Sequence, residues 1–298
     1  KQNIIFCFFF FTSWKSFLLT KIPFSVTVLD VCHLDFKNSF SFKEINPIVF
    51  FVREYLNKKI LPLAYRIITE SKDLKNKIIK LYKLKADLVI SIPNVPSHLL
   101  TIKKNLNTKI VKNKFKISEE FYLYPAQFWE HKNHIIILDA VKKIKDKKNK
   151  INFIFCGKDK GNLHYIKKKI SEYGIQENIK VFSYVTDKEL LVLYRLCKAL
   201  IMPTYFGPTN IPPIEAWSLG VPVAYSNLNR NHGKNAAIYF SPRSPNELLH
   251  VILKLNSKSL RSKLIVNGKK RFKDIKLENK IGHIKISLDM QNLIKKNN

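Results

Sequence analysis

The sequence is poor in arginine and in acidic residues. Seven of its 53 basic residues are arginine and only 22 residues are acidic, so the formal net charge is +31. Proteins that read base edges favour the bidentate arginine fork. Here lysine is spread over nearly every segment, which argues against nucleic-acid binding. The charge predicts instead an attraction to anionic lipid and to polyanionic molecules such as nucleotide diphosphates.

Cysteine pairs, cofactor fingerprints and long apolar runs are also absent. The four cysteines lie far apart and form no C-x-x-C pair, which excludes the common zinc and disulfide patterns. Without G-x-G-x-x-G or a Walker loop, neither a dinucleotide enzyme nor a P-loop kinase is supported. No Asp-x-Asp pair is present, so no metal and no other cofactor is implied. The apolar run at 4–11 is too short to cross a bilayer and predicts a buried strand.

What the sequence does contain is a regular alternation of strand and helix patterns. In the first part of the chain, apolar and β-branched runs predict strands at 24–31, 66–69 and 88–92, with helical periodicity between them. Ser71 is expected to cap the second of these helices. Residues 97–120 are rich in lysine and asparagine and show little periodicity, which predicts a linker.

A second alternating stretch follows the linker. Its predicted strands cover 121–124, 151–156, 179–184, 199–202 and 221–225. The helices between them begin at capping boxes, such as Thr186 to Glu189 and Ser244 to Glu247, or end at a glycine, such as Gly174. Strict alternation implies parallel doubly wound sheets that bind ligands at the carboxyl ends of their strands.

We therefore predict an α/β fold with two Rossmann-like, doubly wound parallel-sheet domains, the N-terminal one incomplete. The first domain and linker are expected over 1–115, the second domain over 116–275, and a helical tail over 276–298.

The most informative segment is 203–223, PTYFGPTNIPPIEAWSLGVPV. A strand is predicted to end at Pro203, and a loop rich in glycine and proline leads to a short helix that starts near Pro213. Such a loop gathers backbone N–H groups and a positive helix end at one point, which makes an anion site. Glu215, expected in the first turn of that helix, would repel phosphate but could accept hydrogen bonds from two adjacent ribose hydroxyls. A simple helix cap after a turn explains the same pattern equally well.

Several motifs together resemble the retaining glycosyltransferases of family 4, the group 1 glycosyltransferases. They are KIPFSVTVLDVCHLDF at 21–36, YPAQFWEHKNHIIILDAV at 124–141, CGKDKGN at 156–162, YFGPTNIPPIEAWSLGVPV at 205–223 and GKNAAIYFSP at 233–242. The resemblance implies the GT-B fold, with a first domain that is truncated because the chain starts about three strands into it. It also places the chain in a subgroup with FGPTN in the 205–223 loop.

The resemblance implies roles for residues on the donor side. Glu215 matches the second Glu of the family's E-x7-E motif and would hold the donor ribose, whereas Gly207 stands in the place of the first Glu. Lys132 matches the basic residue that neutralises the donor diphosphate, and Gln127 replaces its companion arginine. The other expected donor contacts are Gly157, Lys158, Pro208, Thr209, Asn210 and Ile211.

On the acceptor side, the resemblance implies roles for Asp30 and His33. The family usually carries a histidine immediately before the residue that matches Asp30, and here Leu29 takes that place. With Lys132 and Glu215, these two residues complete the expected catalytic set.

The function that the resemblance implies is transfer of a hexosyl group, mannosyl in the matching subgroup, from a nucleotide-diphosphate sugar to a glycan or lipid-linked glycan. The reaction would retain the anomeric configuration and serve cell-surface polysaccharide (lipopolysaccharide) biosynthesis, in the cytoplasm and peripherally on the inner face of an anionic membrane. One alternative is a truncated, inactive nucleotide-sugar binder, favoured by Leu29, Gly207 and Gln127. A basic nucleic-acid-binding protein is another. A glycosidase would need two facing carboxylates, and the conspicuous loops offer only Glu215.

Overall fold

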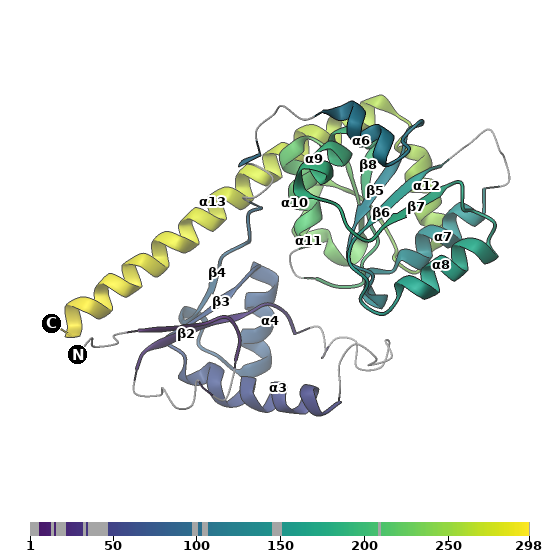
Figure 1. Cartoon of the computed structure of the whole chain (residues 1–298). Helices are drawn as coiled ribbons and strands as arrows, with labels where there is room; N and C mark the ends of the chain where they lie inside the picture. The colour runs from purple at the N-terminus through teal and green to yellow at the C-terminus, as the bar shows by residue number, and fades with distance from the viewer. Residues whose placement is uncertain are drawn as a thin grey trace. The chain divides into compact units, whose positions relative to one another are not determined.

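Two parallel sheets organise the fold, one of four strands and one of six within the part of the chain that the structure describes (Figure 1). The computed structural model describes residues 6–12, 15, 22–31, 34, 47–96, 101–102, 107–144, 151–207 and 210–297. Each sheet lies in its own unit: the first comprises Lys1–Val95, Gly207–Thr209 and Asp274–Asn298, and the second comprises Pro96–Phe206 and Asn210–Lys273. The predicted α/β class is confirmed, and the first sheet is the smaller one.

These units depart from the predicted domain ranges on both sides of the second unit. The predicted linker contains α6 (Thr108–Lys114), which begins at an Asn107 cap and packs on α9 (Asp187–Leu196). Helix α13 (Lys258–Asn297) starts well before the predicted tail, and its residues from Asp274 onward group with the first unit. Sequence periodicity missed α6 because the helix is only seven residues long.

The first sheet has the order β1–β2–β3–β4, and all neighbouring strands are parallel. Its strands are β1 (Cys7–Phe9), β2 (Phe24–Val28), β3 (Arg66–Thr69) and β4 (Val89–Ser91). The connecting helices are α3 (Pro47–Ile60), η2 (Leu61–Leu63), α4 (Lys72–Tyr82) and η3 (Ala86–Leu88). These helices cover the sheet face that carries Val26 and Ile67, and together with it they form the main core of this unit.

Strand β1 exists as predicted but is not buried. It lies at one edge of the sheet and pairs with β2, and Phe10 and Phe11 directly after it are 73% and 69% exposed. A run of aromatic residues favours extended backbone, but it does not reveal how many neighbours the strand will have.

The C-terminal part of α13 covers the other face of the first sheet. Ile286 packs against Ile68, Ile90 and Ile92. The Arg66 guanidinium donates two hydrogen bonds to the Asp289 carboxylate, at 2.6 and 2.8 Å. This bidentate pair stabilises a helix that the sequence predicted only as a tail.

The second sheet has the order β10–β9–β8–β5–β6–β7, again with parallel neighbours. Its strands are β5 (Tyr122–Pro125), β6 (Phe153–Cys156), β7 (Ile179–Phe182), β8 (Ala199–Met202), β9 (Val223–Ser226) and β10 (Ile238–Phe240). Its other helices are η4 (Glu130–Lys132), α7 (His134–Lys142), α8 (Leu163–Glu172), α10 (Ile211–Leu219), η5 (Asn227–Asn229), α11 (Arg230–Gly233), η6 (Lys234–Ala236) and α12 (Pro245–Lys254).

The direction of chain progression through this sheet reverses between β5 and β8. From β5 the chain continues to β6 and β7, and then returns to place β8 on the other side of β5. A reversal of this kind in a parallel sheet leaves a crevice at the carboxyl ends of the two strands. The loops that leave β5 and β8 are therefore where a ligand is expected.

The predicted helix caps are confirmed in part. Thr186 and Glu189 form both hydrogen bonds of a capping box, and Gly174 has the left-handed φ of 66° that ends α8. Ser244 caps α12 as expected, but the Glu247 carboxylate accepts its backbone N–H from Ser241 instead of from Ser244. The second box is therefore only half formed.

Candidate functional site

The loops after β5 and β8 are bonded to each other. The carbonyl of His131 accepts the backbone N–H of Tyr205 at 3.0 Å. The His131 ring stacks on Phe206 with ring centroids 4.0 Å apart. The buried side chain of Asn133, whose backbone has a left-handed φ of 56°, donates to the Pro203 carbonyl at 3.2 Å. These contacts hold residues 131–133 against the start of the 203–223 segment.

Lys132 and Asn210 meet at this junction. The Lys132 Nζ donates to Asn210 Oδ1 at 3.2 Å. The Lys132 backbone is fixed as well, because its carbonyl accepts the hydroxyl of buried Tyr124 at 2.6 Å. The ammonium group is thereby placed at the residue that precedes α10.

Helix α10 begins at Ile211, two residues earlier than predicted. Pro212 and Pro213 fit inside its first turn because the backbone N–H groups of that turn have no intrahelical acceptor to lose. Glu215 consequently lies in the second turn, and the expectation that it stands in the first turn is wrong.

The two prolines also change which groups at the start of this helix can bind an anion. An N-cap asparagine normally accepts an N–H from the second or third helical residue. Here those residues are Pro212 and Pro213, which have none, and the Asn210 side chain makes no capping bond. It is therefore available to Lys132. An anion at this helix end would rely on the Lys132 ammonium more than on backbone N–H groups.

Behind Asn210 a chain of buried polar groups continues inward. Asn210 Nδ2 donates to the Tyr225 hydroxyl at 2.8 Å, and that oxygen lies 3.2 Å from Nδ1 of His232. Burial lowers the pKa of His232 to about 3, so its ring is neutral at ordinary pH. The Tyr225 hydroxyl therefore bridges the amide of Asn210 and the ring of His232. We call the series Lys132, Asn210, Tyr225 and His232 the relay.

Sequence reasoning missed the two inner members of the relay. Tyr225 lies in β9, next to the carboxyl end of that strand, and His232 lies in α11. A tyrosine at the carboxyl end of a predicted buried strand was a usable signal, because ligands gather at that edge. His232 offered none.

Glu215 is buried and oriented by a tyrosine. It is 4% exposed, and its Oε2 accepts the hydroxyl of Tyr194 at 2.7 Å. Burial and the nearby Glu215 charge raise the pKa of Tyr194. Burial, with a smaller contribution from the same carboxylate, raises the pKa of the Cys156 thiol to about 12. The Glu215 charge therefore acts at the carboxyl end of β6, beside Gly157.

Gly157 and Lys158 pack on the loop after β5. A Cβ on Gly157 would lie 2.3 Å from the Ala126 carbonyl oxygen, so a side chain has no room there. The Lys158 carbonyl accepts the backbone N–H of Phe128 at 3.0 Å. Gln127 Oε1 accepts the indole N–H of Trp129 at 2.9 Å. Gly157 was expected to be a donor contact. The close approach of the Ala126 carbonyl is by itself enough to require glycine at this position.

His134 belongs to the core of the second unit. Its ring is fully buried among Tyr124, Phe128 and Phe155, with centroids 4.6, 4.8 and 5.2 Å away. Burial lowers the pKa of His134 to about 3. The neutral ring serves packing at the start of α7.

In the first unit, Asp30 follows β2 and pairs with α3. Arg53 Nη2 donates to Asp30 Oδ1 at 3.1 Å and to its carbonyl at 2.7 Å. Asp30, Leu29 and Arg53 line a cavity of about 390 Å³ together with apolar residues of α3. His33, expected beside Asp30, lies outside the described residues, as do Pro208 and Thr209 of the donor set.

Gly207 has a φ of 133°, in the left-handed region that glycine alone adopts readily. A glutamate at this position would strain this loop. The glycine that replaces the family's first Glu is therefore the residue that this backbone conformation favours.

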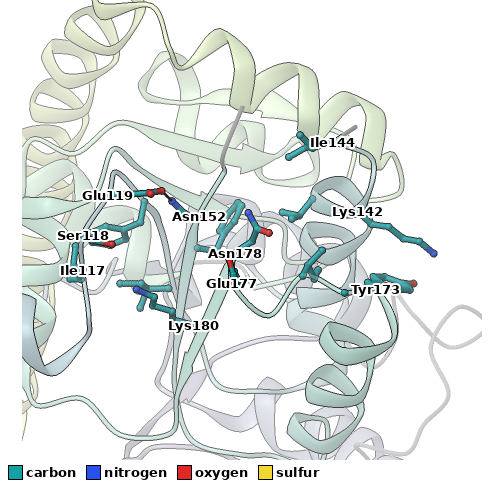
Figure 2. A pocket seen from close by; sticks show the side chains of 16 residues that line it. Ile117, Ser118, Glu119, Lys142, Ile144, Asn152, Tyr173, Glu177, Asn178 and Lys180 are labelled. Carbon is teal, nitrogen blue, oxygen red and sulfur yellow. Dashed lines mark hydrogen bonds between the residues drawn. The ribbon is translucent and has the colours of Figure 1, made fainter. Parts of the chain in front are cut away.

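A larger cavity lies at the opposite edge of the second sheet, at the amino ends of its strands. It measures about 600 Å³ and is lined by residues such as Asn152, Asn178 and Tyr173 (Figure 2). Asn152 Nδ2 donates to Glu119 at 2.9 Å, and Asn178 Nδ2 donates to the Ile151 carbonyl at 3.2 Å. These two amide groups thus already bond to neighbouring protein groups, and none of the residues expected at the donor or acceptor site lines the cavity. We do not assign a ligand to it.

Among the residues that the structure describes, no group of three or more His, Cys, Asp or Glu side chains could hold a metal ion. No described helix combines the length and the apolar character that crossing a membrane requires.

Comparison with known proteins identifies the family to which this fold and site belong. A family model described as "Glycosyl transferases group 1" matches residues 107–271, more than half of the chain and nearly all of the second unit. The O-antigen chain mannosyltransferase RfbU of Salmonella typhimurium is 26% identical over 220 residues, which cover 73% of this chain and 56% of RfbU. The chain thus spans about half the length of RfbU and of the O-antigen chain mannosyltransferase B of Escherichia coli, and 22% or less of the longer serotype-specific mannosyltransferase WbdA.

Two solved structures show the same fold. Sucrose-phosphate synthase of Thermosynechococcus elongatus has a TM-score of 0.77 at 16% identity, over 95% of this chain and 73% of its own. Anabaena HepE in complex with UDP-glucose has a TM-score of 0.72 at 15% identity, over 92% and 75%. The predicted GT-B-like architecture is confirmed, and the chain belongs to the group 1 glycosyltransferases.

Proposed function

We propose that the protein transfers a hexosyl group, mannosyl in particular, from a nucleotide-diphosphate sugar to a glycan or lipid-linked glycan with retention of configuration. The observation that carries the proposal is the 3.2 Å contact of Lys132 with Asn210 at the carboxyl-end crevice between β5 and β8. Membership of the group 1 family supports it. The mannosyltransferase activity of RfbU supports the choice of mannose and a role in polysaccharide biosynthesis, and the UDP-glucose bound to HepE supports a nucleotide-sugar donor.

Lys132 is proposed to bind the donor diphosphate. Because Pro212 and Pro213 remove two N–H groups from the start of α10, the lysine ammonium is the main positive charge that this helix end offers. Backbone groups at Gly207 and Ile211, with the side chains of Thr209 and Asn210, complete the proposed set. Gln127 and Lys158 come from neighbouring loops.

Glu215 is proposed to hold the donor ribose. A carboxylate has about four acceptor positions, and the Tyr194 hydroxyl occupies one of them while it fixes the orientation of the group. Two adjacent ribose hydroxyls could donate to the same carboxylate.

In the reaction, the sugar carbon gains positive character as its bond to the diphosphate oxygen breaks. The electron pair of that bond goes to the leaving diphosphate, whose growing charge Lys132 stabilises. Loss of one such group typically costs about 3 kcal/mol of transition-state stabilisation, a hundredfold or more in rate. The acceptor oxygen then bonds to the sugar carbon on the face from which the diphosphate departs, and its proton passes to an oxygen of the leaving diphosphate. Asp30 and His33 are proposed to act on the acceptor side.

The test compares Lys132→Ala with Lys168→Ala, which removes an exposed lysine of α8. Calorimetric titration with uridine, guanosine and adenosine diphosphates should show tight binding of one of them. Lys132→Ala should weaken that binding at least tenfold with an unchanged melting temperature, and Lys168→Ala should leave it intact. Equal affinity in both variants would remove Lys132 from the site.

A second candidate is a nucleotide-sugar binder without transferase activity. Leu29 favours it, because it is half-exposed at the position where the family usually carries a histidine. Release of free nucleoside diphosphate from a panel of nucleotide sugars, with glycan acceptors present, separates the two candidates.

We further propose that the protein works in the cytoplasm, peripherally at an anionic membrane surface. The net charge of +31 supports this location.

A further inference from the structure

Helix α3 of the first unit turns polar side chains inward. Glu54 and Asn57 are 9% and 2% exposed, and Tyr82 of α4 lies between them. The Tyr82 hydroxyl donates to Glu54 at 2.8 Å and accepts from Asn57 at 3.1 Å. On the same side, Arg53 pairs with Asp30. These contacts set the rotation of the helix about its axis.

Most of the remaining surface of α3 is apolar and exposed. We call this surface the α3 outer face, and it consists of Ile48, Val49, Phe51, Val52 and Tyr55, which are 71%, 56%, 69%, 51% and 60% exposed. Phe50 and Ile60 of the same helix are buried in the normal way, so these five exposed apolar side chains are additional to the face that packs on the sheet. Rotation of the helix to bury this face would break the bonds of Glu54 and Asn57.

The apolar surface extends beyond the helix. Phe11, 69% exposed after β1, lines the same 390 Å³ cavity as Val49 and Val52. The nearby Thr12 hydroxyl donates to Asn57 at 2.6 Å and ties the end of β1 to α3. A contiguous exposed apolar surface usually marks an interaction site, whereas single exposed apolar side chains need no such explanation.

The charges around the α3 outer face are positive. Lys58 and Lys59 occupy the last turn of the helix, and its first turn has no acidic residue. The one carboxylate of the helix, Glu54, points inward to Tyr82. An apolar helix face that ends in lysines matches the boundary between acyl chains and anionic headgroups, where long lysine side chains reach the phosphates.

We propose that the α3 outer face docks on an anionic lipid bilayer, with its apolar side chains in the interfacial layer and Lys58 and Lys59 on the headgroups. The inference rests on the proposed membrane location and not on the donor chemistry. A second copy of the chain is the less favourable occupant, since each copy carries +31 and the lysines of both faces would approach one another.

The experiment measures partition of the whole chain into sedimented vesicles of phosphatidylcholine alone and of phosphatidylcholine with 30% phosphatidylglycerol, about a third anionic lipid. The test variant is Phe51→Ser with Tyr55→Ser, and the matched control is Val266→Ser, a 67% exposed apolar side chain of α13 in the second unit. The expected result is binding of the wild type to anionic vesicles, roughly tenfold or more weaker in the double variant and unchanged in Val266→Ser.

A second variant, Lys58→Glu with Lys59→Glu, should abolish the preference for anionic over neutral vesicles, and added salt should weaken wild-type binding. The melting temperature and the nucleotide affinity serve as controls. The melting temperature should not change because these side chains are exposed. The nucleotide affinity should not change because they lie outside the second unit, which contains Lys132 and Glu215. Equal vesicle binding by wild type and both variants would overturn the proposal. So would a dimer that the Phe51→Ser, Tyr55→Ser variant dissociates, with no vesicle binding by the wild type.

Discussion

Replacing Tyr225 by phenylalanine removes one oxygen from the middle of the relay. Asn210 Nδ2 loses the acceptor that it has at 2.8 Å, and Nδ1 of His232 loses its partner at 3.2 Å. All three side chains are buried, so the groups left behind have little access to water. An unsatisfied buried donor or acceptor costs about 1–3 kcal/mol. For a domain of the size of the second unit, a loss of 1 kcal/mol lowers the melting temperature by about 2–4 °C.

The same substitution is expected to affect the donor site through Asn210. With its amide nitrogen unheld, the Asn210 side chain can rotate, and Lys132 loses a fixed partner. We expect the affinity for the preferred nucleoside diphosphate to fall roughly tenfold, which corresponds to about 1.4 kcal/mol. Calorimetric titration measures it directly.

The control is Tyr239→Phe, which deletes a tyrosine hydroxyl that donates to the Lys234 carbonyl at 2.6 Å, away from Asn210. It should leave nucleotide affinity unchanged. A double-mutant cycle isolates the coupling, because Tyr225→Phe should weaken binding no further once Asn210→Ala is in place. Full additivity of the two changes, or a stability loss without any loss of affinity, would refute the positioning role of Tyr225.

Two further predictions concern buried ionisable groups of the second unit. His134 has a folded pKa of about 3, below the usual 6.5, so the unfolded chain binds an extra proton between these values and stability falls as the pH drops through 6.5. The loss is on the order of 2 kcal/mol at pH 5. Urea unfolding at pH 7 and pH 5 should show a smaller loss in His134→Phe than in the control His164→Phe, and equal losses would contradict it. Glu215→Gln should weaken nucleoside diphosphate binding about tenfold but leave pyrophosphate binding unchanged, since only the former has a ribose. Parallel weakening of both ligands would place Glu215 at the diphosphate instead.

Local sequence signals predicted most of the strands in both sheets. Strands β3 and β8 match their predicted bounds because each is a short apolar run between clear turn or helix signals. The Thr186 box was readable because both of its hydrogen bonds join residues three positions apart. The start of α10 was misplaced because two consecutive prolines look like a break in a helix but fit equally well in its first turn.

Contacts between distant residues limited the rest. The relay joins Lys132 to Asn210 across 78 positions, and only the family resemblance placed both at one site. The inward orientation of Glu54 depends on Tyr82, which is 28 residues away and on another helix. From the sequence of α3 alone, its apolar residues would be assigned to the core.

The paired prolines at the start of α10 have a consequence for how this binding site can evolve. An anion site formed by backbone N–H groups is nearly the same whatever side chains surround it, so point mutations change its affinity and selectivity little. Here Pro212 and Pro213 have withdrawn two of those amides, and Lys132 and Asn210 stand in their place. If Lys132 and Asn210 bind the donor as proposed, single-nucleotide changes at codons 132 and 210 would alter charge, reach and selectivity directly, and donor preference would be open to rapid change between close relatives.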